Sequence, residues 1–153
     1  MGITRSRQRW AASNLGFSPK QINYIYGACK IYDTRVGVDP LFPDELLEDE
    51  DLRMLGEIGS EYGVTTGRRR KVNWLNLDKL IESINKSGTT HCIISKTDIL
   101  EESKLFKLYS KTKLEEFRSL YEMKEYINNR IKGDCINIER IIYSNNVETL
   151  DEN

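Results

Sequence analysis

The fold class is decided by one stretch of the chain, Thr90-His91-Cys92-Ile93-Ile94-Ser95-Lys96-Thr97-Asp98. Its first half is a short apolar run, which is typical of a strand buried in a sheet, and its second half is polar and predicts a turn. A short helix is expected just before it, because apolar residues recur there at helical spacing. Those residues are Leu77, Leu80, Ile81 and Ile84.

A second helix and a last strand follow this stretch. Ser119 and Glu122 have the spacing of a capping box, and the stripe after them consists of Met123, Ile127 and Ile131. Residues 136–143 are rich in β-branched residues and predict a strand. Strand–helix–strand order predicts an α/β fold, a mixed and largely parallel sheet flanked by helices. We expect one domain over residues 1–153.

The N-terminal part predicts two further helices. Ser18-Pro19-Lys20-Gln21 reads as a helix start, and the apolar residues after it have helical spacing: Ile22, Ile25, Tyr26 and Cys29. Residues 35–43 and 63–71 are expected to be loops. Six acids lie between Asp44 and Asp51, where they would form the first turn of a helix whose apolar face is Leu52, Leu55 and Ile58.

The composition excludes several classes of protein. The 153 residues carry 23 basic and 24 acidic side chains, a formal net charge of −1, which disfavours a dedicated nucleic-acid binder. No apolar run approaches the roughly 20 residues of a membrane span, and the first residues lack a signal peptide's apolar core. We therefore expect an intracellular protein. We also expect no metal site, because Cys29, Cys92 and Cys135 lie far apart and His91 is the single histidine.

The first candidate site is the loop Gly63-Val64-Thr65-Thr66-Gly67-Arg68-Arg69-Arg70-Lys71. Its glycines allow tight turns, its threonines supply hydroxyl donors, and arginine forks match carboxylate or phosphate groups. Alternation along an extended loop would direct Arg68 and Arg70 to one side and leave Arg69 solvated on the other. This chemistry favours a small anionic substrate over a basic patch for nucleic acid or a partner protein.

The second candidate site is Ser95-Lys96-Thr97-Asp98, at the end of the buried strand. Ligands of open α/β sheets bind at the carboxyl ends of strands, and an aspartate there could accept from guanine N1–H and its exocyclic amine. The Lys96 stem could cover the purine face. On these four residues alone, a Lys–Asp pair closing a surface turn is the simpler interpretation. Walker, GxGxxG, HExxH and GxSxG motifs are absent from the sequence.

Several segments, in order along the chain, resemble the adenylosuccinate synthetase family. Residues 59–71 with Trp74-Leu75 are similar to its aspartate-binding loop, and residues 95–100 are similar to its TKLDVLD guanine-recognition motif. Upstream, residues 30–37 and Phe42-Pro43 resemble its KAYxTRVGxGPFPTE segment. Tyr126-Ile127 and residues 138–150 resemble its YIxxIE motif and its DIISTGPxRxxTI ending. Together these matches favour the guanine site over the surface turn.

The resemblance implies a GTP-dependent ligase that joins L-aspartate to IMP, with Mg²⁺ in the complete enzyme and homodimers in the cytoplasm. It implies no catalytic residue in this chain. The binding residues it implies are, for aspartate, Val36, Val64, Thr65, Thr66, Gly67, Arg68 and Arg70; for IMP, Arg68 and Thr4; and for GTP, Arg70, Lys96, Thr97, Asp98, Ser144, Asn145 and Asn146.

The resemblance covers only the C-terminal half of the family. The GDEGKGK phosphate loop of its P-loop-GTPase-like nucleotide site is absent here, as is most of the IMP pocket, so a separate N-terminal half would be needed for activity. The family's STG turn appears as Ser144-Asn145-Asn146, and the stretch between Leu100 and Met123 is short, as in compact archaeal and viral members. Two alternatives stay open. One is a viral paralogue that acts on dGMP in the host cytoplasm; the other is a non-catalytic nucleotide-binding or interaction remnant.

Overall fold

A computed structural model describes residues 14–40 and 42–145. The elements in chain order are η1 (Pro19–Gln21), β1 (Tyr26–Lys30), β2 (Tyr32–Arg35), η2 (Asp44–Leu47), α2 (Glu50–Ile58), β3 (Lys71–Asn76), α3 (Leu77–Ser87), β4 (His91–Ser95), α4 (Thr97–Ser103), β5 (Lys107–Ser110), β6 (Lys113–Glu116), α5 (Leu120–Asp134) and β7 (Arg140–Ser144).

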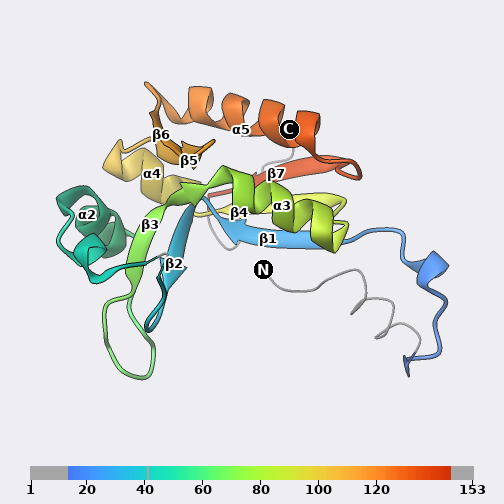
Figure 1. The fold of residues 1–153 in the computed structure, drawn as a ribbon, viewed down its shortest axis with the longest axis horizontal. Helices are drawn as coiled ribbons and strands as arrows, with labels where there is room; N and C mark the ends of the chain where they lie inside the picture. The colour runs from blue at the N-terminus through green and yellow to red at the C-terminus, as the bar shows by residue number, and fades with distance from the viewer. Residues whose placement is uncertain (1–13, 41, 146–153) are drawn as a thin grey trace.

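The strands form two sheets. One is parallel throughout, in the order β1-β4-β7. The other, β2-β3-β5-β6, is mixed, because only its β3–β5 pair is parallel. In Figure 1, α5 runs beside β7, and α2 packs at the end of the molecule where β2 and β3 lie. The predicted α/β class is confirmed, although the strands divide into two sheets where a single one was expected.

The prediction of a helix that starts at Ser18 is wrong. Its capping box does form, since Gln21 Oε1 accepts from the Ser18 amide at 2.8 Å, but it closes only the three-residue η1. The backbone then extends into β1, which pairs with β4 from Tyr26 opposite His91 to Lys30 opposite Ser95. Pairing with a buried strand outweighs the local helical spacing, and Tyr26 stays 61% exposed.

The other three helices predicted from apolar spacing, α2, α3 and α5, are confirmed, with polar caps at their first turns. Asn76 caps α3 by accepting from the Lys79 amide at 3.1 Å, and Ser119 caps α5 by accepting from the Glu122 amide at 3.2 Å. Of the six acids, only the last three begin α2, with Asp49 as its cap, because residues 44–47 form η2.

The strands were predicted less completely than the helices. The predicted strand 90–94 is β4, whereas the predicted strand 136–143 shortens to β7 at Arg140–Ser144. Strands β2, β3, β5 and β6 were not predicted, since each is short and mixes charged with apolar residues. The apolar side chains of β2, β3 and β5 nevertheless join one core with α2, α3 and α5, whereas Leu114 of β6 stays exposed. This core holds Tyr32, Leu55, Trp74, Ile84, Leu108, Met123 and Ile127.

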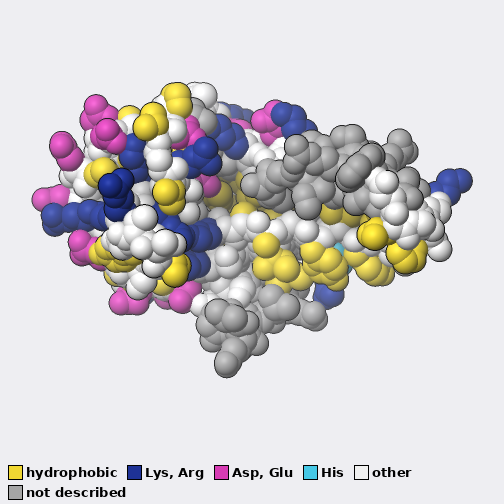
Figure 2. All heavy atoms as spheres, turned by 90° about the horizontal axis from the view of Figure 1, so that it is seen from below, with side chains coloured by type: hydrophobic (Ala, Val, Ile, Leu, Met, Phe, Trp, Pro, Cys, Tyr) yellow, Lys and Arg dark blue, Asp and Glu magenta, His cyan; other side chains and the backbone are white. Residues whose placement is uncertain are grey.

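The structure also shows the state of the cysteines, the character of the helices and the distribution of charge on the surface. Cys92 and Cys135 are buried free thiols and Cys29 is half-buried. None of the helices that the structure describes has the length and apolar character of a membrane span. Seen from below, Lys and Arg side chains gather together with Asp and Glu on the half of the molecule that carries β2, β3 and their loops, whereas the other half shows exposed apolar side chains with few charged ones (Figure 2).

Candidate functional site

The carboxyl ends of three parallel strands meet at one edge of the β1-β4-β7 sheet. Lys30, Ser95 and Ser144 are the last residues of these strands and lie in register with one another. Ser95 Oγ donates to the Cys29 carbonyl at 2.9 Å and ties the ends of β1 and β4 together. This edge is where an open parallel sheet exposes ligand-binding groups, so the fold places the segment 95–98 where the sequence predicted.

Lys96 connects β4 to α4 in the left-handed region of backbone conformation, with φ at 65°. That conformation costs a non-glycine residue about 1–2 kcal/mol, so surrounding contacts must hold it. One of them is direct, because Lys96 Nζ donates to the Gly59 carbonyl at 2.7 Å. The Lys96 side chain therefore lies close to the start of the loop 63–71, called the arginine loop below.

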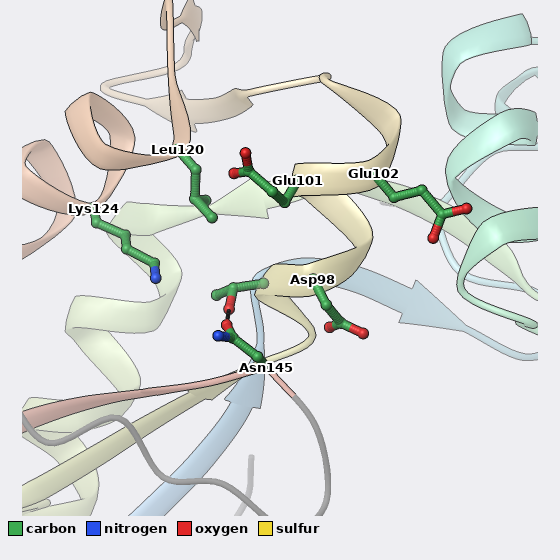
Figure 3. Close-up of a pocket in the computed structure, with 7 residues that line it drawn as sticks. Asp98, Glu101, Glu102, Leu120, Lys124 and Asn145 are labelled. Atoms are coloured by element: carbon green, nitrogen blue, oxygen red, sulfur yellow. Dashed lines mark hydrogen bonds between the residues drawn. The ribbon is translucent and has the colours of Figure 1, made fainter.

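Thr97 is fully buried and joins α4 to the end of β7. Its hydroxyl donates to the Ser144 carbonyl at 3.4 Å and is hydrogen-bonded to the Asn145 side chain (Figure 3). Ser144 and Asn145 are thus brought beside the segment 95–98, as expected for one binding site. Asn146 and Thr4 lie outside the residues that the structure describes.

Asp98 is exposed and lines a pocket of about 560 Å³. The other lining residues are Thr97, Glu101, Glu102, Leu120, Lys124 and Asn145. Figure 3 shows Glu101 directed toward Leu120 and Lys124 of α5, while the Asp98 carboxylate points away from them. Within the described part of the chain, no hydrogen bond or ion pair engages that carboxylate, so its oxygens remain accessible to a ligand donor.

The predicted arginine loop is a compact turn that presents its first residues to solvent. The Gly67 amide donates to the Gly63 carbonyl at 2.8 Å, and the Gly63 amide donates to the Arg68 carbonyl at 2.8 Å. Gly67 has a φ of 61°, which glycine adopts freely. Between these bonds Val64, Thr65, Thr66 and Arg68 are exposed, so their polar groups are available to a ligand.

The predicted alternation of the three arginines is wrong for Arg69. Its Nε lies 3.8 Å from where a Cβ would stand at Gly56 of α2, and that Nε is buried without a hydrogen-bond partner among the residues that the structure describes. Arg69 is therefore packed against a helix and is not a solvated charge. Arg70 also turns inward, and its Nη1 lies 3.2 Å from Glu61 Oε2, whereas Arg68 is exposed.

Val36 lies beside the arginine loop because of strand pairing. Arg35 ends β2 opposite Lys71, the first residue of β3, so the residue after one strand and the residue before the other are neighbours. Figure 1 shows both loops at the same end of the molecule. Val36 is 69% exposed at this end, close to the arginine loop with which the sequence analysis grouped it.

Glu61 links the two candidate sites, and sequence reasoning missed it. Its side chain is only 2% exposed, and its Oε1 lies 2.6 Å from Lys30 Nζ and 3.5 Å from Lys96 Nζ. The Tyr32 hydroxyl donates to the same oxygen at 2.9 Å, and Arg70 engages the other oxygen. A single glutamate in a polar segment carries no periodic signal, so only its folded surroundings reveal this role.

The charges around Glu61 set its protonation. Burial alone would raise the pKa of its carboxyl, but hydrogen bonds from Lys30 and Tyr32 and the charges of Lys30 and Lys96 leave that pKa below its usual value. Burial, and then the hydrogen bond to Glu61, raises the pKa of the Tyr32 phenol. Glu61 is therefore an anion and Tyr32 a neutral donor at neutral pH.

The described residues offer no cluster of three side chains as ligands for a magnesium ion. Residues 14–40 and 42–145 contain no cluster of three His, Cys, Asp or Glu side chains that could hold a metal ion. The three acids that line the 560 Å³ pocket do not converge on a point where they could share a metal ion, because Figure 3 shows the side chains of Asp98, Glu101 and Glu102 pointing in different directions.

Comparisons with known proteins give this arrangement a family. Residues 4–132 match the adenylosuccinate synthetase family model. Adenylosuccinate synthetase of Komagataella phaffii is 49% identical over 96 residues, which are 63% of this chain and 22% of the relative. That of Chlorobaculum parvum is 46% identical over 91 residues, 60% of this chain and 20% of the relative. The matched region thus spans about a fifth of the length of these relatives.

A solved structure supports the fold. The fully ligated adenylosuccinate synthetase of Plasmodium falciparum superimposes with a TM-score of 0.70 at 20% sequence identity, covering 93% of this chain and 42% of that one. The parallel and mixed sheets flanked by helices are therefore those of a known fold. Because the family match spans most of the chain, this protein belongs to the adenylosuccinate synthetase family, whose members are GTP-dependent ligases of purine biosynthesis.

Proposed function

We propose that this chain is the C-terminal portion of a compact adenylosuccinate synthetase and forms a single domain over residues 1–153. It supplies the aspartate and guanine subsites of a ligase that joins L-aspartate to IMP at the expense of GTP. The phosphate loop, the Mg²⁺ ligands and most of the IMP pocket come from an N-terminal portion. Family resemblance adds a homodimer and a cytoplasmic location.

One observation carries the proposal. The arginine loop and the segment 95–98 are far apart in sequence, yet Arg70 and Lys96 meet on the single buried carboxylate of Glu61. A surface turn and an unrelated basic loop would not need a shared counter-ion. The arrangement suits two neighbouring anionic ligands, since Lys30, Lys96 and Arg70 exceed Glu61 by two positive charges.

The aspartate subsite is assigned to Val36, the loop residues Val64, Thr65, Thr66 and Gly67, and the arginines Arg68 and Arg70. The exposed threonine hydroxyls and the Arg68 fork can donate to the two carboxylates of the amino acid. Glu61 holds Nη1 of Arg70, and the remaining terminal nitrogen of that guanidinium is assigned to a ligand carboxylate or phosphate. Arg68 and Thr4 are proposed to reach IMP.

The guanine subsite is assigned to Lys96, Thr97 and Asp98 together with Ser144, Asn145 and Asn146. Asp98 accepts from guanine N1–H and the exocyclic amine, and adenine presents an acceptor at the first of these positions. The 560 Å³ pocket beside Asp98 is large enough for a purine ring system. The hydrogen bonds of Thr97 hold residues 144–145 at the same site.

The test is nucleotide binding followed by complementation. Isothermal titration of the chain with GDP and with ADP should show a clear preference for GDP. Mixing the chain with the N-terminal portion of the Komagataella phaffii enzyme should then give phosphate release that requires GTP, IMP and L-aspartate together. Release with dGMP in place of IMP would identify the purine as dGMP. Equal affinity for GDP and ADP, with no release in the mixture, would overturn the proposal.

A further inference from the structure

We propose that Glu61 is a positioning residue that couples the guanine subsite to the aspartate subsite, so that each ligand tightens the binding of the other. The inference rests on the proposed function, because it names what connects its two subsites. It concerns a residue that contacts neither ligand directly and acts through Lys96 on one side and Arg70 on the other.

The contacts of Glu61 divide between its two oxygens. Oε1 faces Lys30 at 2.6 Å, the Tyr32 hydroxyl at 2.9 Å and Lys96 at 3.5 Å, whereas Oε2 faces Arg70 at 3.2 Å. The carboxylate is planar and buried, so a rotation that improves one contact moves the other oxygen as well. A change at Lys96 is therefore transmitted to Arg70 through one rigid group.

Lys96 is the end of this connection that belongs to the proposed guanine subsite. It lies 3.5 Å from Glu61, longer than a hydrogen bond, and its Nζ is held instead by the Gly59 carbonyl at 2.7 Å. Its backbone is also in the left-handed region, at the junction of β4 and α4. A guanine base that orders residues 96–98 fixes this lysine and with it the orientation of Glu61.

Arg70 is the end that responds. Its side chain is half-buried, its Nε is buried without a hydrogen-bond partner, and Glu61 is its only ion-pair partner within the described residues. When Glu61 is held in one orientation, the Arg70 guanidinium is held as well. Binding of the aspartate carboxylate to Arg70 then costs less side-chain entropy. By linkage, aspartate then tightens the guanine nucleotide by the same factor.

The first arm of the test measures ligand coupling. The affinity of GDP is titrated with and without saturating L-aspartate for the wild-type chain, for Glu61→Gln and for Asp78→Asn. Asp78→Asn is the control, since it removes an acidic partner of another arginine, Arg130 at 3.0 Å, from a more exposed place away from the site. The wild type and the control should bind GDP at least about fivefold more tightly with aspartate present, and Glu61→Gln should show a factor near one.

The second arm needs no ligand. Lys96→Met should shift the Nε–H resonance of Arg70, assigned by its loss in Arg70→Lys, in the wild-type background but not in the Glu61→Gln background. A coupling factor unchanged in Glu61→Gln, or an Arg70 resonance indifferent to Lys96→Met, overturns the inference. If the wild type binds no guanine nucleotide, the proposed function fails, and the resonance of Arg70 still decides the role of Glu61.

Discussion

Nη1 of Arg70 lies 3.2 Å from Oε2 of Glu61, nine residues earlier in the chain. The carboxylate is buried and the arginine reaches it from the end of an exposed loop, so this pair fixes where the loop joins the rest of the fold. Arg68, two residues before, is exposed, and no carboxylate within residues 14–40 and 42–145 forms an ion pair with it. The arginines of one loop therefore differ in role.

The first prediction separates the three arginines by Arg→Lys substitution. In the complemented enzyme, the change at Arg68 or Arg70 should raise the aspartate KM at least about tenfold, roughly 1.4 kcal/mol, because lysine lacks the bidentate fork. Arg69→Lys should change it less than about twofold, since Arg69 packs against α2. Steady-state kinetics measure this, and equal effects at all three positions would remove the substrate-loop assignment.

The second prediction concerns guanine selectivity at Asp98. Asp98→Asn turns one acceptor into a donor that faces the guanine donors, and should weaken GTP binding by about 2–3 kcal/mol, or roughly 30- to 150-fold. Xanthosine triphosphate should bind the variant relatively better. Glu102→Gln, at another acid lining the same pocket, is the matched control and should stay near wild type in the same titrations. Unchanged GTP affinity in Asp98→Asn would count against the guanine subsite.

The third prediction tests the packing beneath Glu61 with two glycines. A Cβ at Gly59 would collide with the Tyr32 hydroxyl and lie 3.1 Å from the Leu55 carbonyl, so Gly59→Ala should destabilise the fold by about 1–3 kcal/mol. Gly133→Ala, in α5 with nothing within 4 Å, should stabilise it by about 0.4–1 kcal/mol. Urea unfolding compares the two, and a Gly59→Ala chain as stable as wild type would contradict this packing.

The fourth prediction is a pH dependence from Glu61. Its folded pKa is lowered from 4.5, so the folded state binds that proton less tightly than the unfolded state does. The stability it contributes is therefore complete above the unfolded pKa and is lost as the pH falls through the folded pKa. The difference in unfolding free energy between wild type and Glu61→Gln should shrink between about pH 6 and about pH 3. A constant difference would show that the charge of Glu61 contributes nothing.

The fifth prediction is that the 153 residues alone turn over no substrate. Phosphoryl transfer depends on a phosphate cradle and bound Mg²⁺, and the sequence contains no GDEGKGK loop. Purified chain with GTP, IMP, aspartate and Mg²⁺ should release phosphate no faster than buffer, while still binding GDP. Turnover by this chain alone would mean that its own residues supply the cradle.

Local sequence patterns determined α2, α3, α5 and the central strand β4, but not α4, where only a turn was predicted. Apolar spacing and polar caps, such as Asn76 and Ser119, specify α3 and α5, because side chains three and four apart share one face and the caps satisfy free amides. The run before Ser95 specifies β4. The candidate site at residues 63–71 was predicted from its local chemistry, whereas residues 95–98 were favoured as a site only through their resemblance to the family's motif.

Tertiary structure alone decided that residues 26–30 form a strand and that Glu61 joins the two candidate sites. Residues 22–29 have helical spacing, but pairing with β4 makes residues 26–30 a strand, and that pairing depends on residues more than sixty positions away. Glu61 binds Lys30, Tyr32, Arg70 and Lys96 through contacts that no local pattern contains. A carboxylate is kept charged in the interior only by partners the fold brings to it, so its role becomes visible only when the chain is folded.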